Sequence, residues 1–296
     1  MPSSLLEFEN VGKSYANANG TSLVLEGFNL RIARGEFVSI IGHSGCGKST
    51  ALMMAAGLTE ITSGYIFLAC QEIVGPGPDR GVVFQSPSLL PWLTALENVR
   101  LGVDRVYPRA ARGQRDEICK YYLSRVGLAD GFHKKAIDLS NGMKQRVGIA
   151  RAFALKPRIL LLDEPFGMLD SMSRSELQDV LMEIWSKEQI TAMLVTHDID
   201  EALFLSDRVI MMTNGPRAKV GDILEISIPR PRVRKDVIDH PNYYRYQGHL
   251  IDFLENGHRG QEKVSAAPVE KIPTVGKEEF FVPTTEDSNE PVPDTV

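Results

Sequence analysis

One glycine-rich loop, set between a short apolar strand and a helix, constrains the fold of this chain more than any other feature. Residues 37–41 read FVSII, an apolar run that predicts a buried strand, and residues 42–50 read GHSGCGKST. The loop fits the pattern G-x-x-x-x-G-K-[ST], in which glycines let successive backbone N–H groups surround phosphate oxygens. A helix that begins near Lys48 directs the positive end of its dipole at the same oxygens. The loop therefore predicts a nucleotide phosphate site.

The residues of this loop are candidates for contact with the nucleotide. We expect Lys48 to pair with the β and γ phosphates and the hydroxyl of Ser49 to bind Mg²⁺. A glycine-rich turn that merely contains a lysine is the alternative, and the strand before it and the helix after it disfavour that interpretation. We also expect alkylation of the Cys46 thiol to block activity, with bound nucleotide protecting it. The predicted nucleotide contacts in the loop are Gly42, His43, Ser44, Gly45, Cys46, Gly47, Lys48, Ser49 and Thr50.

A second apolar run ends in two carboxylates. Residues 159–164 read ILLLDE, which predicts a buried strand that ends at Asp163 and Glu164. Asp163 is expected to hold Mg²⁺, directly or through water. Glu164 is expected to polarise the attacking water, because hydrolysis needs a base or an orienting carboxylate in line with the γ phosphate. An acidic pair that only caps a strand is the alternative, but together with the phosphate loop the pair indicates a nucleoside triphosphatase.

Strands and helices are predicted to alternate along most of the chain, which favours an α/β fold with a mostly parallel sheet covered by helices. Residues 173–187 repeat apolar side chains with the helical period, and Ser173 with Glu176 predicts a capping box at the start of that helix. Residues 88–157 lack a strand pattern and predict a helical subdomain inserted into the core. The remaining predicted strands span residues 5–11, 23–32, 81–84, 192–196 and 208–213.

Charge and composition exclude several classes of protein. The net formal charge is −5, and residues 257–296 hold eight acidic against four basic side chains, so the body is nearly neutral and no nucleic-acid partner is expected. No apolar run approaches the roughly 18 residues of a spanning helix, and the N-terminus lacks the pattern of a secretory signal. Cys46, Cys70 and Cys119 have no metal-ligand spacing and indicate a reduced cytosolic compartment. We expect a helical extension over residues 231–256 and a disordered acidic tail after it.

A third motif narrows the class of protein. Residues 139–152 read LSNGMKQRVGIARA, in which Ser140 is placed to cap a basic amphipathic helix and so to form a second anion site. Taken alone, the segment could be an ordinary capped helix. Together with the other two motifs it resembles the LSGGQ signature of ATP-binding-cassette (ABC) ATPases. The resemblance covers residues 5–225 and implies a P-loop NTPase fold, with a RecA-like parallel-sheet core, an N-terminal antiparallel β subdomain and an inserted helical subdomain, in an ATPase domain over residues 1–230.

The resemblance implies ATP as the ligand, Mg²⁺ as the metal and four further site residues. Tyr15, in VGKSY, is similar to the aromatic residue that stacks on adenine in this family. Gln85, at the end of GVVFQ, resembles the glutamine near Mg²⁺ and the attacking water. Asp170, in FGMLD, resembles the aspartate that reaches across the dimer, and His197, in LVTHD, resembles the histidine that contacts the γ phosphate. A purely structural histidine after a strand is the alternative for His197.

In this family two cassettes face each other head to tail, and each ATP lies between the phosphate loop of one and the signature of the other. Ser140 and Gly142 are therefore expected to contact a partner's ATP. Asn141 replaces the first signature glycine, which is tolerable where a positive φ is needed, and Met143 replaces the glutamine, which removes a polar contact. The resemblance assigns hydrolysis to Glu164, His197 and Gln85, and Mg²⁺ to Ser49, Gln85 and Asp163.

The chain holds one cassette and no predicted membrane segment, so the resemblance implies a peripheral ATPase subunit on the cytoplasmic face of the inner membrane, docked on separate permease subunits. Residues 89–93 (LLPWL) predict a hydrophobic docking groove, with subdomain core as the alternative. The asparagine-methionine signature and the late segment HPNYYRYQGHLIDFL resemble the nitrate and bicarbonate branch of an importer group that also carries taurine and sulfonates. In that branch a sister cassette is the expected partner, a homodimer is the alternative, and a substrate-binding protein acts indirectly.

We expect nitrate or nitrite as the transported ion, with bicarbonate, aliphatic sulfonate or taurine as alternatives. Two further classes of function were weighed. A regulatory cassette that binds ATP with little turnover is disfavoured because every hydrolytic residue is present. A small-molecule kinase with a phosphate loop is disfavoured because it leaves the signature helix and His197 without a role.

Overall fold

The computed structural model describes residues 4–17 and 20–256. The acidic tail predicted over residues 257–296 lies outside the described residues. Within the described part of the chain, no helix is both long enough and apolar enough to cross a membrane.

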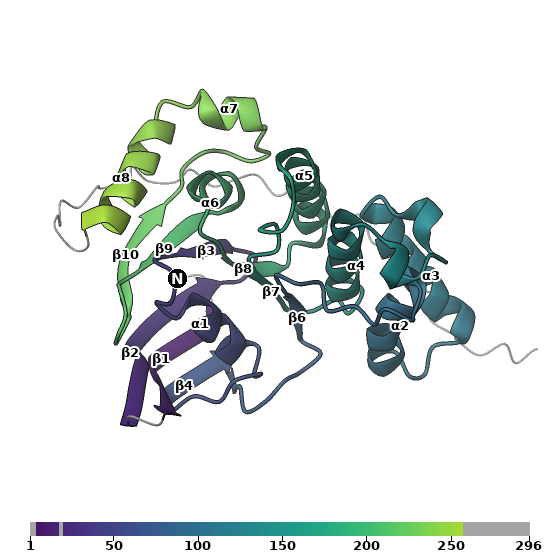
Figure 1. Ribbon diagram of the computed structural model, residues 1–296, viewed down its shortest axis with the longest axis horizontal. Coiled ribbons are helices and arrows are strands. Elements are labelled where there is room, and N and C mark those ends of the chain that lie inside the picture. The colour runs from purple at the N-terminus through teal and green to yellow at the C-terminus, as the bar shows by residue number, and fades with distance from the viewer. Residues whose placement is uncertain (1–3, 18–19, 257–296) are drawn as a thin grey trace, which may run out of the picture. The chain divides into compact units, whose positions relative to one another are not determined.

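A six-stranded sheet forms the centre of the fold (Figure 1). Its neighbouring strands pair in parallel except at one edge, where the last strand runs antiparallel. This confirms the predicted α/β fold with a mostly parallel sheet. The strands follow one another in the order β10 (Val220–Glu225), β9 (Arg208–Met212), β3 (Phe37–Ile41), β8 (Thr191–Val195), β7 (Ile159–Asp163) and β6 (Arg80–Val83).

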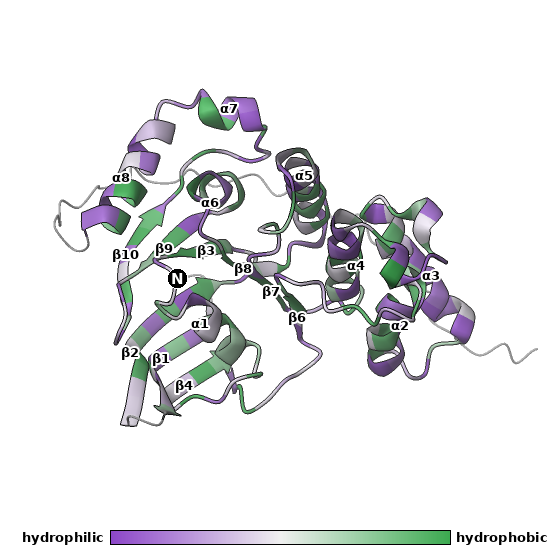
Figure 2. Ribbon diagram, in the orientation of Figure 1, coloured by the Kyte–Doolittle hydropathy of each residue, from purple (hydrophilic) through white to green (hydrophobic). Residues whose placement is uncertain are grey.

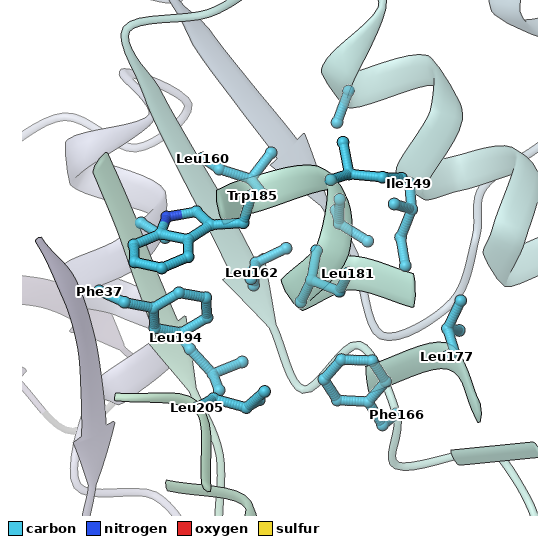
Figure 3. Close-up of a cluster of buried hydrophobic side chains, with 14 of the residues drawn as sticks. Phe37, Ile149, Leu160, Leu162, Phe166, Leu177, Leu181, Trp185, Leu194 and Leu205 are labelled. Carbon is cyan, nitrogen blue, oxygen red and sulfur yellow. The ribbon is translucent and has the colours of Figure 1, made fainter. Parts of the chain in front are cut away.

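The three central strands β3, β8 and β7 are buried on both faces, which explains why they are continuous apolar runs (Figure 2). Successive side chains of a strand point to opposite faces. Phe37, Leu160 and Leu194 therefore pack toward α5 (Ser171–Glu188) and α6 (Ile199–Leu205), where the Trp185 indole meets the Phe37 ring edge to face at 5.5 Å (Figure 3). The alternate residues, such as Val38 and Leu161, pack toward α1 (Lys48–Ala55) and a second sheet.

The second sheet is antiparallel, as the family resemblance implies, in the order β2 (Gly20–Ala33), β1 (Ser4–Asn17), β4 (Ser63–Leu68) and β5 (Gln71–Glu72). The two long strands extend beyond the predicted ranges because their ends form a hairpin that projects toward solvent, where the apolar pattern is lost. Strands β4, β5 and β10 were not predicted. They lie at or near sheet edges, where β5 is exposed and β4 and β10 are partly exposed, so their sequences carry a weak apolar signal.

Helices fill the chain between β6 and β7, as predicted for that region. They are α2 (Ala95–Val106), α3 (Arg112–Arg125), two short 3₁₀ turns (Ala129–Gly131 and Ala136–Asp138) and α4 (Asn141–Phe153). Thr94 begins α2 with a capping box, since its hydroxyl accepts from the N–H of Glu97 and the Glu97 carboxylate accepts from the N–H of Thr94. Helix α4 packs on both α2 and α3 and against β6, so it joins this group to the central sheet.

Two predicted helix boundaries were wrong. Helix α5 begins at Ser171 rather than Ser173, because Asp170 caps it by accepting from the N–H groups of Met172 and Ser173. The helical extension predicted over residues 231–256 is two helices, α7 (Arg234–Ile238) and α8 (Tyr243–Asn256). Pro241 lies between them, and proline disfavours helical conformation in the residue before it. Helix α8 packs against α6 (Figure 1).

Candidate nucleotide site

The phosphate loop connects β3 to α1, as its sequence predicts. Gly47 caps α1 with φ of 100°, and a Cβ placed there would lie 2.9 Å from a methyl of Val24, so only glycine fits. The Lys48 side chain turns back along the loop, where its ammonium donates to the carbonyls of Gly42 at 2.8 Å and His43 at 2.9 Å. Both partners are neutral, so the buried Lys48 side chain provides a positive charge that an anionic phosphate can neutralise.

The thiol of Cys46 is buried between Gly42 and the apolar residues beneath α1, and this burial opposes the predicted block by alkylation. Its side chain is 1% exposed and belongs to the apolar cluster beneath α1, while its backbone N–H donates to the carbonyl of His43 at 3.3 Å. Burial also raises the pKa of the thiol, which lowers the fraction of reactive thiolate. Cys46 can therefore serve the nucleotide only through its backbone.

We expect iodoacetamide to modify Cys70 of the folded chain well before Cys46, with or without nucleotide. Cys70 is exposed, whereas Cys46 and Cys119 are buried, and burial raises the pKa of Cys119 to about 12. Mass spectrometry of peptides after timed labelling measures this order, and labelling in denaturant supplies the control in which all three thiols react. Rapid labelling of Cys46 that ATP slows would restore the sequence-based interpretation.

The side chains of Ser49 and Asp163 contact each other beside the phosphate loop. The Ser49 hydroxyl donates to Asp163 Oδ1 at 2.8 Å, and burial raises the pKa of Asp163 while this hydrogen bond opposes the rise. Hydroxyl and carboxylate oxygens are the hard ligands that Mg²⁺ prefers, and Mg²⁺ usually takes its other ligands from water and substrate phosphates. Among the described residues no group of three or more His, Cys, Asp or Glu side chains could hold a metal without such help. The pair thus fits a Mg²⁺ that arrives with a nucleotide.

Glu164 lies between the two other side chains predicted for hydrolysis. Its Oε2 accepts from Gln85 Nε2 at 3.3 Å and lies 3.2 Å from His197 Nδ1. Glu164 follows β7, Gln85 follows β6 and His197 follows β8, so the carboxyl ends of three neighbouring parallel strands bring them together. The arrangement can hold a water molecule near a base, an amide and an imidazole on one side of the phosphate loop.

The two signature residues lie at the start of α4. Ser140 caps this helix, as predicted, with its hydroxyl accepting from the N–H of Met143 at 3.3 Å. A Cβ placed on Gly142 would lie 4.0 Å from the side chains of Leu169 and Ser173. Asn141 is the first helical residue and does not have a positive φ, so the predicted reason for tolerating asparagine is wrong. Met143 packs against the apolar cluster beside α4. This apolar contact takes the place of the polar contact that a glutamine would make at the same position.

Tyr15 is an exposed residue of β1, and its ring contacts Lys13, a neighbour that the sequence motifs did not indicate. The ammonium of Lys13 lies 4.7 Å from the centre of the ring while it donates to the carbonyl of Glu60. Residues two apart in a strand share a face, and this was the signal available in the sequence.

Asp170, predicted to reach across a dimer, has a carboxylate whose pKa is lowered by its hydrogen bonds from Ser173 and Met172.

These features together define a phosphate-loop ATPase. They are the phosphate loop between β3 and α1, the carboxylate pair at the end of β7, and the glutamine, the imidazole and the capped helix around them. A model of the family described as ABC transporter matches residues 25–167. The bicarbonate transport ATP-binding protein CmpD of Synechococcus elongatus is 50% identical over 248 residues, which cover 84% of this chain and 89% of that one. The nitrate transport protein NasD of Klebsiella oxytoca is 48% identical over 251 residues, or 84% of this chain and 96% of that one.

A solved structure is similar as well. The dimeric, post-hydrolysis structure of the ATP-binding cassette MJ0796, bound to ADP and Pi, matches with a TM-score of 0.68 and 33% identity, over 75% of this chain and 99% of that one. The chain belongs to the ABC transporter family and is its ATP-binding, ATP-hydrolysing component. The predicted P-loop NTPase fold and ABC ATPase class are thereby confirmed.

Proposed function

We propose that this chain drives uptake of a small inorganic anion, nitrate or nitrite in the first place, as the ATPase subunit of a membrane importer. The observation that carries the ATPase step is the position of Glu164 between Gln85 and His197, beside Ser49 and Asp163. The substrate class is supported by the names of the similar nitrate and bicarbonate proteins. Bicarbonate is the second candidate, because CmpD is as similar to this chain as NasD is.

In the proposed reaction, Tyr15 stacks on adenine and Lys48 moves from the loop carbonyls to the β and γ phosphates. Gly42–Thr50 surround those phosphates with backbone N–H groups. Ser49, Gln85 and Asp163 would hold Mg²⁺, which when bound neutralises charge on the phosphates. Glu164 takes a proton from the attacking water. The His197 imidazole moves away from the Glu164 oxygen and donates a hydrogen bond to the γ phosphate instead.

A second cassette completes the site in this proposal. Ser140, Gly142 and Asp170 lie at the starts of α4 and α5, where helix N-termini leave backbone N–H groups unpaired. A partner's ATP would contact Ser140 and Gly142, and Asp170 would reach the partner. The dimeric state of the MJ0796 cassette supports such an arrangement. We favour a sister cassette over a second copy of this chain as the partner.

The permease is proposed to dock beside Gln85, which would hold the chain peripherally on the cytoplasmic face of the membrane. A pocket of about 310 Å³ lies there, and Gln85, Leu89 and Pro91 line it together with Ile137 and Met168. Large apolar side chains are exposed around it, with Trp92 at 66%, Ile137 at 65% and Met168 at 56%. Of the predicted groove, Leu89, Leu90 and Leu93 are half-buried rather than exposed. Leu89 packs against the apolar core, so part of the segment belongs to it. Exposed apolar side chains at one place are typical of a docking surface.

We expect Trp92→Ala to reduce copurification with the permease about tenfold while leaving the affinity for ATP unchanged. A tenfold loss corresponds to about 1.4 kcal/mol, which lies within the range for truncation of a large aromatic residue at an interface. Tyr65→Ala is the matched control, because Tyr65 is an exposed aromatic residue on the N-terminal sheet. Equal copurification of the Trp92 variant and the wild type would move the docking site elsewhere.

Uptake of labelled nitrate and bicarbonate tests the proposed substrate. Cells that carry the chain intact are compared with cells that carry Glu164→Gln, which keeps the fold but removes the proposed base. Loss of nitrate uptake alone supports the first candidate, and loss of bicarbonate uptake alone supports the second. If neither changes, both candidates fail, and sulfonates and taurine are tested next.

A further inference from the structure

Helix α8 touches the helix that follows His197. The phenolic hydroxyl of Tyr243, in the first turn of α8, donates to Asp200 Oδ1 at 2.7 Å. Gln247 Nε2, one turn later, donates to the same oxygen at 3.1 Å. Asp200 is the second residue of α6, which begins at Ile199, so both hydrogen bonds hold the end of α6 that adjoins His197.

The last turn of α8 touches the phosphate loop. His43 Nε2 lies 2.5 Å from the carbonyl oxygen of Leu254. A carbonyl oxygen only accepts, so the imidazole donates in this contact. Helix α8 therefore spans from the start of α6 to the second residue of the phosphate loop, and it connects two parts of the nucleotide site that lie far apart in the sequence (Figure 1).

A buried polar chain connects α6 to the segment before α8. Gln178 Nε2, on α5, donates to Glu201 Oε1 at 2.7 Å, and Arg234 Nη2, on α7, donates to Gln178 Oε1 at 2.7 Å. The guanidinium of Arg234 also lies 4.2 Å from the ring of Phe204 on α6. Thr196, directly before His197, hydrogen bonds to the Glu201 carboxylate, and burial raises the pKa of that carboxyl to about 7. Buried polar chains of this kind hold the elements that they join in one geometry.

Helix α6 has seven residues, which is too short to be stable without its neighbours. Its orientation, and with it the direction of His197, is therefore set by the groups that contact it. We infer that α8 braces α6 against the phosphate loop and that Tyr243 is a positioning residue for ATP hydrolysis, acting through Asp200 on His197. The inference rests on the proposed roles of His197 and Glu164.

The chain contains a matched control for Tyr243. Tyr246 lies one turn further along α8 and is as buried, at 3% against 5%. Its hydroxyl pairs with Ser227 Oγ at 2.6 Å, outside α6. The Tyr246 hydroxyl also accepts from the N–H of Ser227 at 3.3 Å, so Tyr246→Phe removes two hydrogen bonds and Tyr243→Phe removes one. The control is therefore expected to lose at least as much stability as Tyr243→Phe. Only Tyr243→Phe removes a hydrogen bond to Asp200, which then keeps the hydrogen bond from Gln247 alone.

The test measures ATP hydrolysis and thermal unfolding of the full chain assembled with its permease, as wild type, Tyr243→Phe and Tyr246→Phe. Loss of one hydrogen bond to a charged group predicts a kcat about threefold to tenfold lower for Tyr243→Phe, with KM for ATP within about twofold of wild type. The kcat of Tyr246→Phe should equal that of wild type. An unchanged kcat in Tyr243→Phe, or equal losses in both variants, would overturn the inference.

A double-mutant comparison separates action through Asp200 from a general effect of the helix. In the Asp200→Ala background, Tyr243→Phe should lower kcat no further, because its partner is already absent. A full additional loss in that background would overturn the inference while leaving the proposed function in place. If the assembled wild type hydrolyses no ATP, the proposed function fails and the inference fails with it. If it hydrolyses ATP and Tyr243→Phe matches it, only the inference fails.

Discussion

Replacement of Glu164 by glutamine is expected to lower kcat for ATP hydrolysis by about 100-fold or more while ATP still binds. A positioned general base contributes roughly 10² to 10⁴ in rate, and an amide cannot take the proton. Glutamine can keep the contacts of Glu164 because its carbonyl oxygen still accepts from Gln85 Nε2 and from His197 Nδ1. The loss should therefore appear in kcat rather than in KM for ATP. Loss of a negative charge near the γ phosphate should also lengthen the lifetime of the nucleotide-bound dimer.

Steady-state ATPase assays and size-exclusion chromatography with ATP measure these two effects. Glu176→Gln is the matched control, because it makes the same substitution at an exposed ion pair with Arg146, away from the phosphate loop. This variant should keep wild-type kcat. Near-normal hydrolysis by the Glu164 variant would remove Glu164 from its role and leave the phosphate loop as a binding site only.

Replacement of Arg232 by leucine is expected to lower the free energy of unfolding by about 2 to 4 kcal/mol. Helix ends leave carbonyl groups unpaired, and Arg232 satisfies those at the end of α6. Its Nη1 donates to the carbonyls of Leu203 and Phe204, each at 3.1 Å, and of Ser206 at 2.7 Å. Burial is strong enough to lower the pKa of the guanidinium to about 10, so the side chain is tightly enclosed. Leucine can fill part of that space but donates nothing.

Denaturation by urea, followed by circular dichroism, measures this loss. Arg31→Leu is the control, since the Arg31 side chain is 71% exposed and its ion pair with Glu7 is of the surface kind that contributes little. That variant should unfold within about 0.5 kcal/mol of wild type. Equal midpoints for the Arg232 variant and wild type would show that solvent or neighbouring donors replace the guanidinium.

Local chemistry was sufficient for the phosphate loop, for strands β3 and β7 and for the cap of α4. The central strands β3 and β7 have the predicted bounds because they are buried on both faces and so appear as unbroken apolar runs. Ser140 was predictable as a cap because its bond to the N–H of Met143 reaches only three residues along the chain.

The predictions that differ from the structure share one cause. In each case the local sequence allows more than one conformation, and tertiary packing selects one of them. The Cys46 thiol could face the loop or the core, and the apolar cluster under α1 draws it inward. Both Asp170 and Ser173 can cap a helix, and the turn after β7 presents Asp170 to the free N–H groups. Edge strands such as β10 have a weak apolar pattern because only one side of them is covered.

The amino-acid sequence alone was therefore enough for the α/β class and the ABC resemblance, and it also named the candidate site residues, because each depends on a contiguous motif. Their arrangement depended on the tertiary structure. Strand order places Gln85, Glu164 and His197 at adjacent strand ends, although they are far apart along the chain. The contacts of α8 with Asp200 and His43 join segments that no local pattern relates, since a hydrogen bond between distant residues exists only after packing has brought its donor and acceptor together.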